Sequence, residues 1–102
     1  MGLTIESEQL PDERLIRVAG EVDLYSSPEL RKAILQAMPS GDGRLSIDLS
    51  GVSYIDSSGV ATLVEGLRAA NENGAKFTLV APSSAVIQVL ELARLDSVFK
   101  IV

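Results

Sequence analysis

The chain has 102 residues, of which 46% are hydrophobic and 23% are charged, and this composition predicts one folded domain over residues 1–102. Its net charge of −5, with nine Lys and Arg residues scattered along the sequence, argues against a surface that binds nucleic acid. Cysteine and histidine are absent and every apolar stretch is shorter than a bilayer span, which argues against disulfides, metal sites, general-base catalysis and a membrane protein.

The first third of the chain predicts two strands followed by a helix. Leu3–Ser7 alternates between apolar and polar residues, as an edge strand does, and Arg14–Ala19 predicts a second strand. A helix then begins at Ser26 or Ser27, because Ser26 forms a capping box with Glu29, while Ser27 precedes a proline at the first helical position. The predicted buried face of this helix consists of Leu30, Ala33, Ile34 and Ala37.

The rest of the chain alternates strands with helices. Arg44–Leu49 predicts a strand, a loop follows over Gly51–Gly59, and a second helix ends at Asn73–Gly74. Lys76–Ala81 predicts the next strand, a third helix follows, and Val98–Val102 predicts a short last strand. The buried face of the second helix is predicted as Val60, Leu63, Val64 and Leu67, and that of the third as Val86, Val89, Leu90 and Ala93. Three leucines are expected to be core and helix-end residues rather than a partner surface: Leu90, Leu92 and Leu95.

This element order, β-β-α-β-α-β-α-β, predicts an α/β fold. Strands that alternate with helices pair in parallel through right-handed crossovers, and the first strand adds a hairpin or an edge. We therefore expect a small mixed β-sheet covered on one side by helices. Sites in such sheets gather at the carboxyl ends of the strands, which selects two loops, Gly20–Ser27 and Gly51–Gly59.

The second of these loops contains a polar cluster directly before a predicted helix: Asp56, Ser57, Ser58 and Gly59. Helix capping explains part of it, because Asp and Ser are preferred N-caps and glycine eases a tight turn. Capping needs only one polar residue, whereas three stand in a row. A phosphate on a serine here would meet N–H groups and the positive end of the helix dipole, and Gly59 would leave room for it. The pattern alone leaves both interpretations open.

Glu21 and Asp23 lie in the first loop, and taken alone they are typical of a solvated loop. If the two loops are neighbours, Asp23 comes near Ser57, where carboxylates could orient the hydroxyl or assist a partner's metal ion. Neither a general base nor a lysine that could hold a phosphate accompanies them. We therefore expect no catalysis by this chain.

The segment LSIDLSGVSYIDSSGVATLV (Leu45–Val64) closely resembles the signature of the STAS domain in its anti-sigma-factor antagonist form. In that family a strand ends in D-L-S-x-V, and D-S-[ST]-G-[LV] then opens a helix. RVAGEVDLYSSPELRKAI (Arg17–Ile34) is similar to the family's G-E-[IVL]-D element and first helix, and Gly74–Val102 is similar to its last third. The resemblance covers nearly the whole chain, and its phosphosite motif is quite specific.

The resemblance implies a single STAS domain that acts by partner switching in transcription regulation, for example in stress response or sporulation. In that family the unphosphorylated antagonist binds an anti-sigma factor, usually also a serine kinase, and so frees a sigma factor. The kinase phosphorylates the first serine after the Asp and abolishes the complex, and a metal-dependent serine phosphatase restores it. By position the resemblance implies Ser57 as the phosphoacceptor, Ser58 as part of the helix start and Asp23 as an acidic neighbour.

The resemblance further implies a partner-binding set that consists of Glu21, Asp23, Asp56, Ser57, Ser58 and Gly59. A cytoplasmic protein is expected, with no catalytic residues, cofactor, metal, nucleic-acid partner or membrane partner. The alternative function is that of a STAS scaffold or accessory subunit, either of a stressosome-type sensory assembly or of a lipid transporter. The intact D-S-S-G favours the switch. Family members commonly continue past the FKI segment into a final helix, whereas this sequence stops at Val102.

Overall fold

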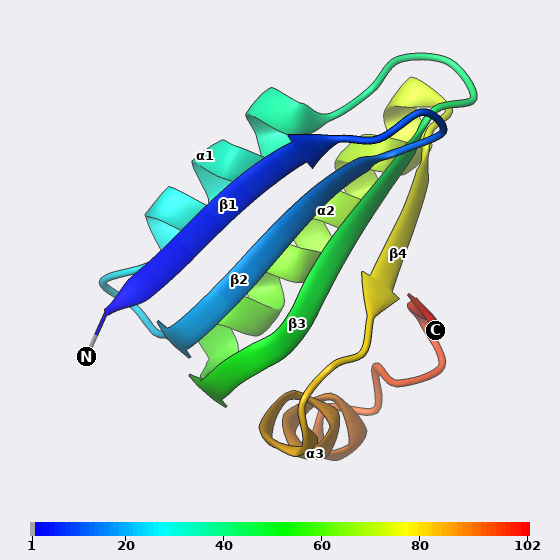
Figure 1. The fold of residues 1–102 in the computed structure, drawn as a ribbon. Helices are drawn as coiled ribbons and strands as arrows, with labels where there is room; N and C mark the ends of the chain where they lie inside the picture. Colours follow the sequence, from blue (N-terminus) through cyan, green and yellow to red (C-terminus); the bar gives the residue numbers. More distant parts are fainter. Residues whose placement is uncertain (1) are drawn as a thin grey trace.

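A computed structural model describes residues 2–102 as a five-stranded sheet with three helices, in the order predicted from the sequence (Figure 1). The strands lie in the spatial order β1-β2-β3-β4-β5, with β1 antiparallel to β2 and the other neighbours parallel. The elements are β1 (Leu3–Gln9), β2 (Arg14–Val22), α1 (Ser27–Ala37), β3 (Arg44–Ile55), α2 (Ser57–Asn73), β4 (Lys76–Val80), α3 (Ser84–Leu92) and β5 (Lys100–Ile101). The predicted α/β fold class, with β1 at an edge, is confirmed.

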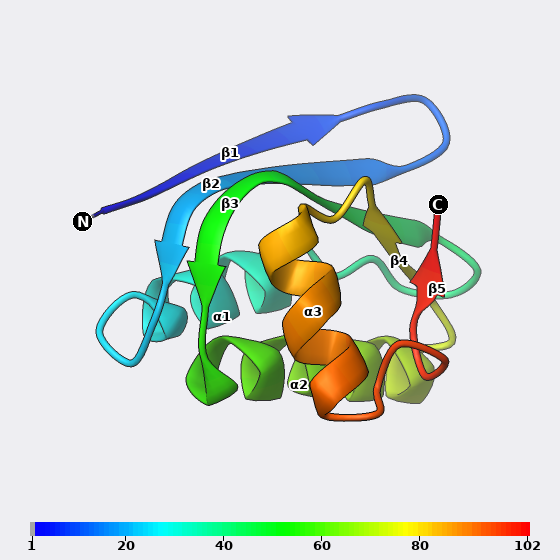
Figure 2. The same ribbon diagram turned by 90° about the horizontal axis from the view of Figure 1, so that it is seen from below.

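Two of the helices cover one face of the sheet. Helices α1 and α2 lie side by side behind β1, β2 and β3 (Figures 1 and 2). Their apolar stripes meet inward-facing strand residues, so the core is almost entirely aliphatic, with one aromatic pair, Phe77 and Phe99, whose ring centroids are 6.4 Å apart. The largest side chains that this core buries completely include Ile16, Leu30, Ile34, Leu45, Ile47, Leu49, Leu63 and Leu79.

Helix α3 occupies a different place, because β4 is much shorter than β3. Strand β4 pairs with β3 only over Arg44–Asp48, which leaves the carboxyl half of β3 without a neighbouring strand on that side. The start of α3 packs there instead: the Ser83 N–H donates to the carbonyl of Leu49 at 3.3 Å, and its hydroxyl donates to the carbonyl of Val52 at 2.6 Å. The expectation that helices cover one side of the sheet therefore holds for α1 and α2, while α3 fills the end beside β3 (Figure 2).

Strands β2 and β3 are longer than the sequence pattern predicted. They run in parallel to Val22 and Ile55, with register shifts between Arg17 and Ala19 and between Gly20 and Glu21. A side chain at Gly51 would place its Cβ 2.9 Å from the Cβ of Ala19, so glycine permits the close approach at the first of these irregularities. Residues that suggested a loop over 51–55 therefore belong to a bulged strand pair. The loop before α2 shrinks to Asp56 alone.

The ends of α2 and α3 share one geometry. In each, the left-handed residue after the helix is followed by an N–H that donates back to the last turn, from Ala75 to Ala70 in α2 and from Leu95 to Leu90 in α3, both at 2.8 Å. The left-handed residue of α2 is Gly74, with φ 74°, as predicted, whereas in α3 it is Arg94, with φ 59°. Two sequence expectations at this end are wrong, because the Leu92 side chain is 86% exposed instead of packed, and Ala93, predicted on the buried face of the helix, is also exposed.

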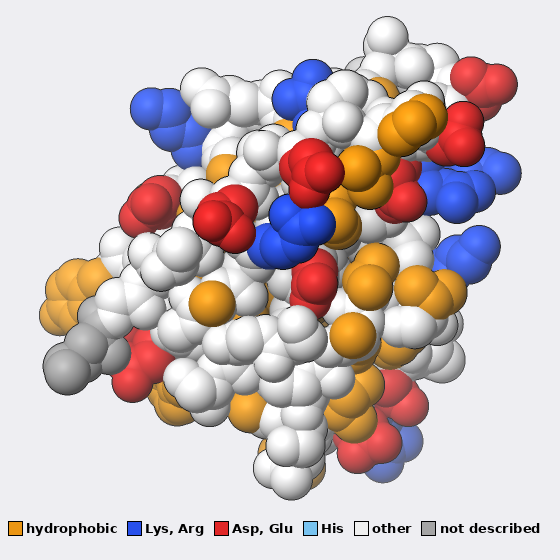
Figure 3. Space-filling model, in the orientation of Figure 1, with side chains coloured by type: hydrophobic (Ala, Val, Ile, Leu, Met, Phe, Trp, Pro, Cys, Tyr) orange, Lys and Arg blue, Asp and Glu red, His pale blue; other side chains and the backbone are white. Residues whose placement is uncertain are grey.

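The sheet face opposite α1 and α2 carries charges of both signs over part of its area. Acidic and basic side chains are mixed over the upper part of this face in Figure 3, its lower part is mostly uncharged, and Arg17 and Glu8 form an ion pair at 2.8 Å. Because both signs are interspersed, this face offers no basic surface of the kind that nucleic acid requires.

Candidate functional site

The start of α2 is capped by Asp56. Its Oδ1 accepts hydrogen bonds from the N–H groups of Ser58 at 2.9 Å and Gly59 at 3.3 Å, while its own N–H donates to the Val22 carbonyl at 3.1 Å. The same residue therefore ends β3, joins that end to β2 and begins the helix. The sequence left two interpretations of this segment open, helix capping and a phosphate site. The Asp56 carboxylate caps the helix by itself, so neither serine is needed for capping.

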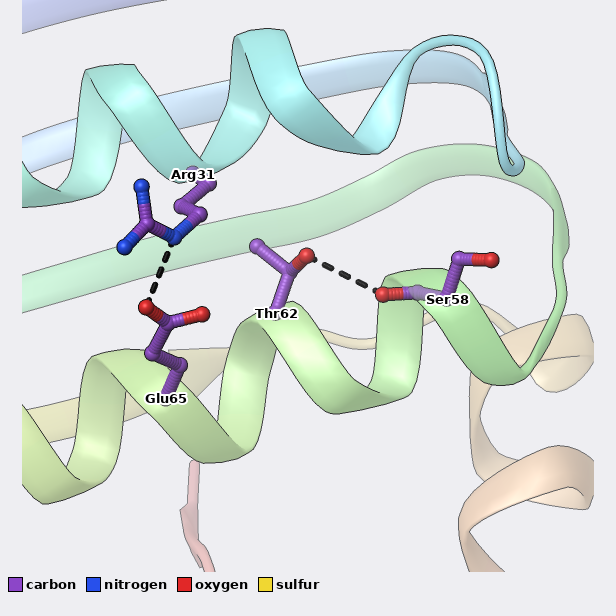
Figure 4. A network of polar contacts seen from close by, with 4 residues as sticks. All are labelled: Arg31, Ser58, Thr62 and Glu65. Carbon is purple, nitrogen blue, oxygen red and sulfur yellow. Dashed lines mark hydrogen bonds and ion pairs between the residues drawn. The ribbon is translucent and has the colours of Figure 1, made fainter.

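The two serines that follow have different surroundings. Ser57 is the first residue of α2 and its side chain is exposed. Ser58 is half-buried, and its carbonyl accepts a hydrogen bond from the Thr62 hydroxyl at 3.0 Å in the next turn (Figure 4). A macromolecular partner can therefore reach the Ser57 hydroxyl more directly than the Ser58 hydroxyl.

Gly59 is required by packing. A Cβ at this position would lie 2.7 Å from Val22 Cγ1 and 2.7 Å from Ile55 Cγ1, both on buried side chains at the ends of β2 and β3. The open side of the glycine thus faces the core. The sequence had suggested that Gly59 leaves room for a group on the neighbouring serine, but the geometry accounts for the glycine by the close approach of α2 to the sheet.

The loop between β2 and α1 is organised by Asp23. Its Oδ1 accepts hydrogen bonds from the N–H groups of Tyr25 and Ser26, each at 2.9 Å, and from the Ser26 hydroxyl at 3.1 Å. The Ser26 N–H holds the pKa of the Asp23 carboxyl below its ordinary value; partial burial opposes this, and the Ser26 hydroxyl and the Tyr25 N–H reinforce it. Asp23 is thus an ionised residue that shapes its own loop.

This arrangement corrects the predicted start of α1. Ser26 occupies the N-cap position, but its hydroxyl makes no capping bond to the helix. The hydroxyl instead accepts a hydrogen bond from the Asp23 N–H and donates one to the Glu21 carbonyl, each at 2.9 Å. Ser26 therefore stabilises the loop that precedes the helix. The capping box with Glu29 is therefore wrong. The helix itself begins at Ser27, with Ser26 at the N-cap position and Pro28 as the second helical residue. The alternative start, with Ser27 as N-cap and the proline at the first helical position, is therefore off by one residue.

The two loops lie together, as the topology predicted. Val22 and Ile55 are partners in the β2–β3 register, and the bond from Asp56 to Val22 ties the two strand ends. Asp23 and Ser57 therefore leave neighbouring strands at the same edge. Within residues 2–102, however, no hydrogen bond joins their side chains. Glu21, half-buried in β2 opposite Tyr54, lies at the same edge.

Exposed apolar residues surround this edge, and sequence reasoning missed them. Tyr25 is 90% exposed and Leu24 is 64% exposed in the loop after β2, while Tyr54 is half-exposed near the end of β3. The available signal was the pair Leu24-Tyr25 beside Asp23, in a segment otherwise expected to be a polar loop. The edge thus combines acidic side chains with unburied aromatic ones.

A groove of about 770 Å³ continues from this edge along the outer side of α2. Ser57 lines one end, and Val60, Ala61 and Val64 form its floor, with Leu35 of α1 and Leu95 as walls. Arg31 of α1 and Glu65 of α2 make an ion pair at 2.6 Å across it (Figure 4). The exposed serine is therefore continuous with an apolar surface.

A family model described as "Mlab, STAS domain" matches residues 5–102, which is nearly the whole chain. The chain belongs to the STAS domain family. Proteins named anti-sigma-B factor antagonist from Staphylococcus epidermidis and Staphylococcus aureus are each 28% identical to it over 101 residues, with 99% of this chain and 94% of the relative covered.

Solved structures carry the same STAS fold. An anti-sigma factor antagonist from Mycobacterium paratuberculosis superposes with a TM-score of 0.86 at 27% identity, over 98% of this chain and 85% of that one. The anti-sigma factor antagonist SpoIIAA in its unphosphorylated form gives a TM-score of 0.76 at 23% identity, over 97% and 88%, and shows the fold alone. The resemblance to STAS-domain antagonists and the fold class, both predicted from the sequence, are confirmed.

Over residues 2–102, no helix combines the length and apolar character that crossing a membrane requires. In the same residues, acidic side chains do not gather in groups of three or more that could hold a metal ion.

Proposed function

We propose that this protein is an anti-sigma-factor antagonist controlled by phosphorylation of Ser57. Its unphosphorylated form binds an anti-sigma factor with serine kinase activity and so frees a sigma factor, and a metal-dependent serine phosphatase reverses the modification. The names of its relatives support the antagonist role. The observation that carries the phosphorylation step is the exposed Ser57 at the first position of α2, next to an Asp56 that alone caps the helix.

Partner binding, in this proposal, is centred on the edge formed by the β2–α1 loop and the start of α2. The geometry supports a structural role for each residue of the predicted partner-binding set. Asp23 holds the shape of the first loop, and Asp56 holds the start of α2. Gly59 lets that start approach the sheet, while Glu21 and Ser58 complete the surface around Ser57.

The phosphate acts by its charge and size. It adds about −1.5 to −2 charges at neutral pH, beside an Asp56 carboxylate that already occupies the N–H groups of Ser58 and Gly59. A kinase that transfers phosphate to Ser57 must bring the nucleotide phosphates against this hydroxyl, so the phosphoserine then faces like charges in a desolvated contact. Such a contact costs several kcal/mol, which corresponds to about a thousandfold loss of affinity.

The fold itself should tolerate the modification, because the N-terminal end of a helix favours negative charge. Ser57→Asp and Ser57→Glu should reproduce part of the loss of binding, since one carboxylate carries less charge than a phosphate. Function inside the cytoplasm is part of this proposal, because sigma factors and their regulators act there.

The test begins with wild-type protein immobilised as bait for anti-sigma factors in the native lysate, which are identified by mass spectrometry and purified. Incubation of such a factor with ATP should label Ser57. Ser57→Ala should abolish labelling and keep binding, while Ser58→Ala, its matched control, should be labelled normally. Label on Ser58 alone would contradict the assignment. Recovery of only transporter or stressosome-type subunits, with no kinase, would favour a STAS scaffold instead.

A further inference from the structure

The β2–α1 loop holds the most exposed aromatic side chain of the described residues. Tyr25 is 90% exposed, and Leu24 beside it is 64% exposed. The chain has only four aromatic residues, and both phenylalanines are buried against each other in the core. An aromatic ring of this size is worth most to a protein when it is buried, in its own core or in that of an interface.

The backbone that carries Tyr25 is fixed, although its side chain is free. Its N–H donates to the Asp23 carboxylate at 2.9 Å, and the next turn closes with the Ser27 N–H donating to the Asp23 carbonyl at 2.8 Å. The Ser26 hydroxyl bonds the Glu21 carbonyl at 2.9 Å. A partner would therefore order little more than the two side-chain torsions of the ring, which lowers the entropic cost of using it as a contact.

The position of Tyr25 places it within one interface with Ser57. The two residues leave the paired ends of β2 and β3, three residues after Val22 and two residues after Ile55. Steps of 3.8 Å along the chain and about 4.8 Å between strands keep their Cα atoms within about 24 Å. A standard interface of about 800 Å² on each partner is about 32 Å across, so a protein that covers one of them can cover both.

The charge around the loop specifies what such a partner presents. Residues 18–30 contain no Lys or Arg but contain Glu21, Asp23 and Glu29, and residues 45–67 likewise contain no basic residue. Tyr25 and Leu24 are thus an apolar centre with an acidic surround. The complementary surface is an apolar pocket with Arg or Lys side chains opposite Asp23 and Glu29.

We propose that Tyr25, supported by Leu24, is the anchor residue with which the unphosphorylated protein enters an apolar, basic-rimmed pocket on its anti-sigma factor. This inference rests on the proposed function and adds to it a contact outside the phosphorylated segment. Tyrosine is enriched among the residues whose truncation costs most in protein interfaces, because its ring is large, rigid and amphipathic.

The experiment measures the affinity of the purified anti-sigma factor that phosphorylates Ser57 for unphosphorylated variants, by calorimetric titration. Tyr25→Ala should weaken binding by about 30-fold or more, and Leu24→Ala by less. Tyr25→Phe keeps the ring and should stay close to wild type. Val102→Ala is the matched control, because Val102 is as exposed as Leu24 at 64% but directly follows β5, about 23 Å short of the end of β3.

Each possible outcome of these measurements either supports or overturns the proposed anchor. Tyr25→Ala binding like wild type, or Val102→Ala losing as much affinity, overturns the anchor while the proposed function stands. A wild-type protein that neither binds nor is phosphorylated removes the proposed function and the anchor with it. Self-association abolished by Tyr25→Ala, with the anti-sigma factor still bound normally, assigns the surface to a second copy and also overturns the proposal. Thermal unfolding of Tyr25→Ala should match wild type, since the ring makes no core contact.

Discussion

Gly59→Ala should destabilise the fold, because the added methyl group points at two buried side chains. Its carbon would lie 2.7 Å from both Val22 Cγ1 and Ile55 Cγ1, roughly 1 Å inside the separation of about 3.5–4.0 Å that carbon atoms prefer. Val22 and Ile55 are 0% and 3% exposed, so neither can move into solvent. Overpacking of this kind costs about 1–3 kcal/mol, while the gain in helix propensity returns at most about 1 kcal/mol.

Two close contacts with buried atoms place the substitution in the upper part of this range, at about 2–3 kcal/mol. After the gain in helix propensity is subtracted, we expect a net loss of about 1–2 kcal/mol in the free energy of unfolding, measured by urea denaturation followed by circular dichroism. For a domain of this size the midpoint of thermal unfolding should fall by about 4–16 °C. In a Val22→Ala background the same substitution should cost clearly less, because the removed methyl groups leave space. A cost below about 0.5 kcal/mol, or an equal cost in both backgrounds, would refute the packing argument. Normal stability with lost Ser57 phosphorylation would instead support the idea that Gly59 makes room for the phosphate.

Three further predictions concern single residues. Asp56→Ala removes the acceptor of two N–H groups at the start of α2 and should cost about 1–2 kcal/mol in urea unfolding, whereas Ser57→Ala should cost much less; equal costs would contradict the capping assignment. The folded pKa of Asp23 is lowered, so its carboxylate stabilises the fold above the unfolded pKa near 3.9, and this contribution disappears as pH falls through the lower folded pKa. Asp23→Asn should therefore flatten the loss of stability below about pH 4, and parallel curves for the two proteins would argue against it. Arg94→Gly should raise the free energy of unfolding by about 0.5–1 kcal/mol, because a left-handed backbone costs a non-glycine residue roughly 1 kcal/mol; Gly74→Ala at the equivalent position of α2 should have the opposite sign.

The boundaries of α2 could be predicted because local chemistry decides them. The Asp before the first turn accepts hydrogen bonds from unpaired N–H groups, and the glycine after the last turn adopts the left-handed conformation that ends the helix. Both requirements arise within a few residues of the sequence. The alternating β-α order likewise follows from local periodicity and fixes the parallel sheet. Ser57 as an exposed residue at a helix start could be predicted for the same reason.

The features that could not be predicted depend on distant neighbours. The strand β3 continues through Gly51 because Ala19 of β2 lies against it, and no pattern within 44–55 contains that information. The Ser26 hydroxyl could form hydrogen bonds either with the helix or with the preceding loop. The path of residues Glu21–Asp23 determines that it bonds with the loop. Tyr25 and Leu92 are exposed because no other element packs against them, and sequence periodicity does not indicate where this happens.

Ser83 protects the β3 strand that leads to Ser57 from unwanted association. A long parallel strand whose carboxyl half has no neighbour on one side offers free carbonyl groups there, which are a template for strand addition by another molecule and hence for aggregation. Ser83 donates to two of these carbonyls, those of Leu49 and Val52, and its hydroxyl also accepts from Val86 to begin α3. One side chain thus starts a helix and blocks part of a sheet edge. The β2–β3 pair can thereby extend beyond β4 and β5 at a low risk of fibre-like stacking.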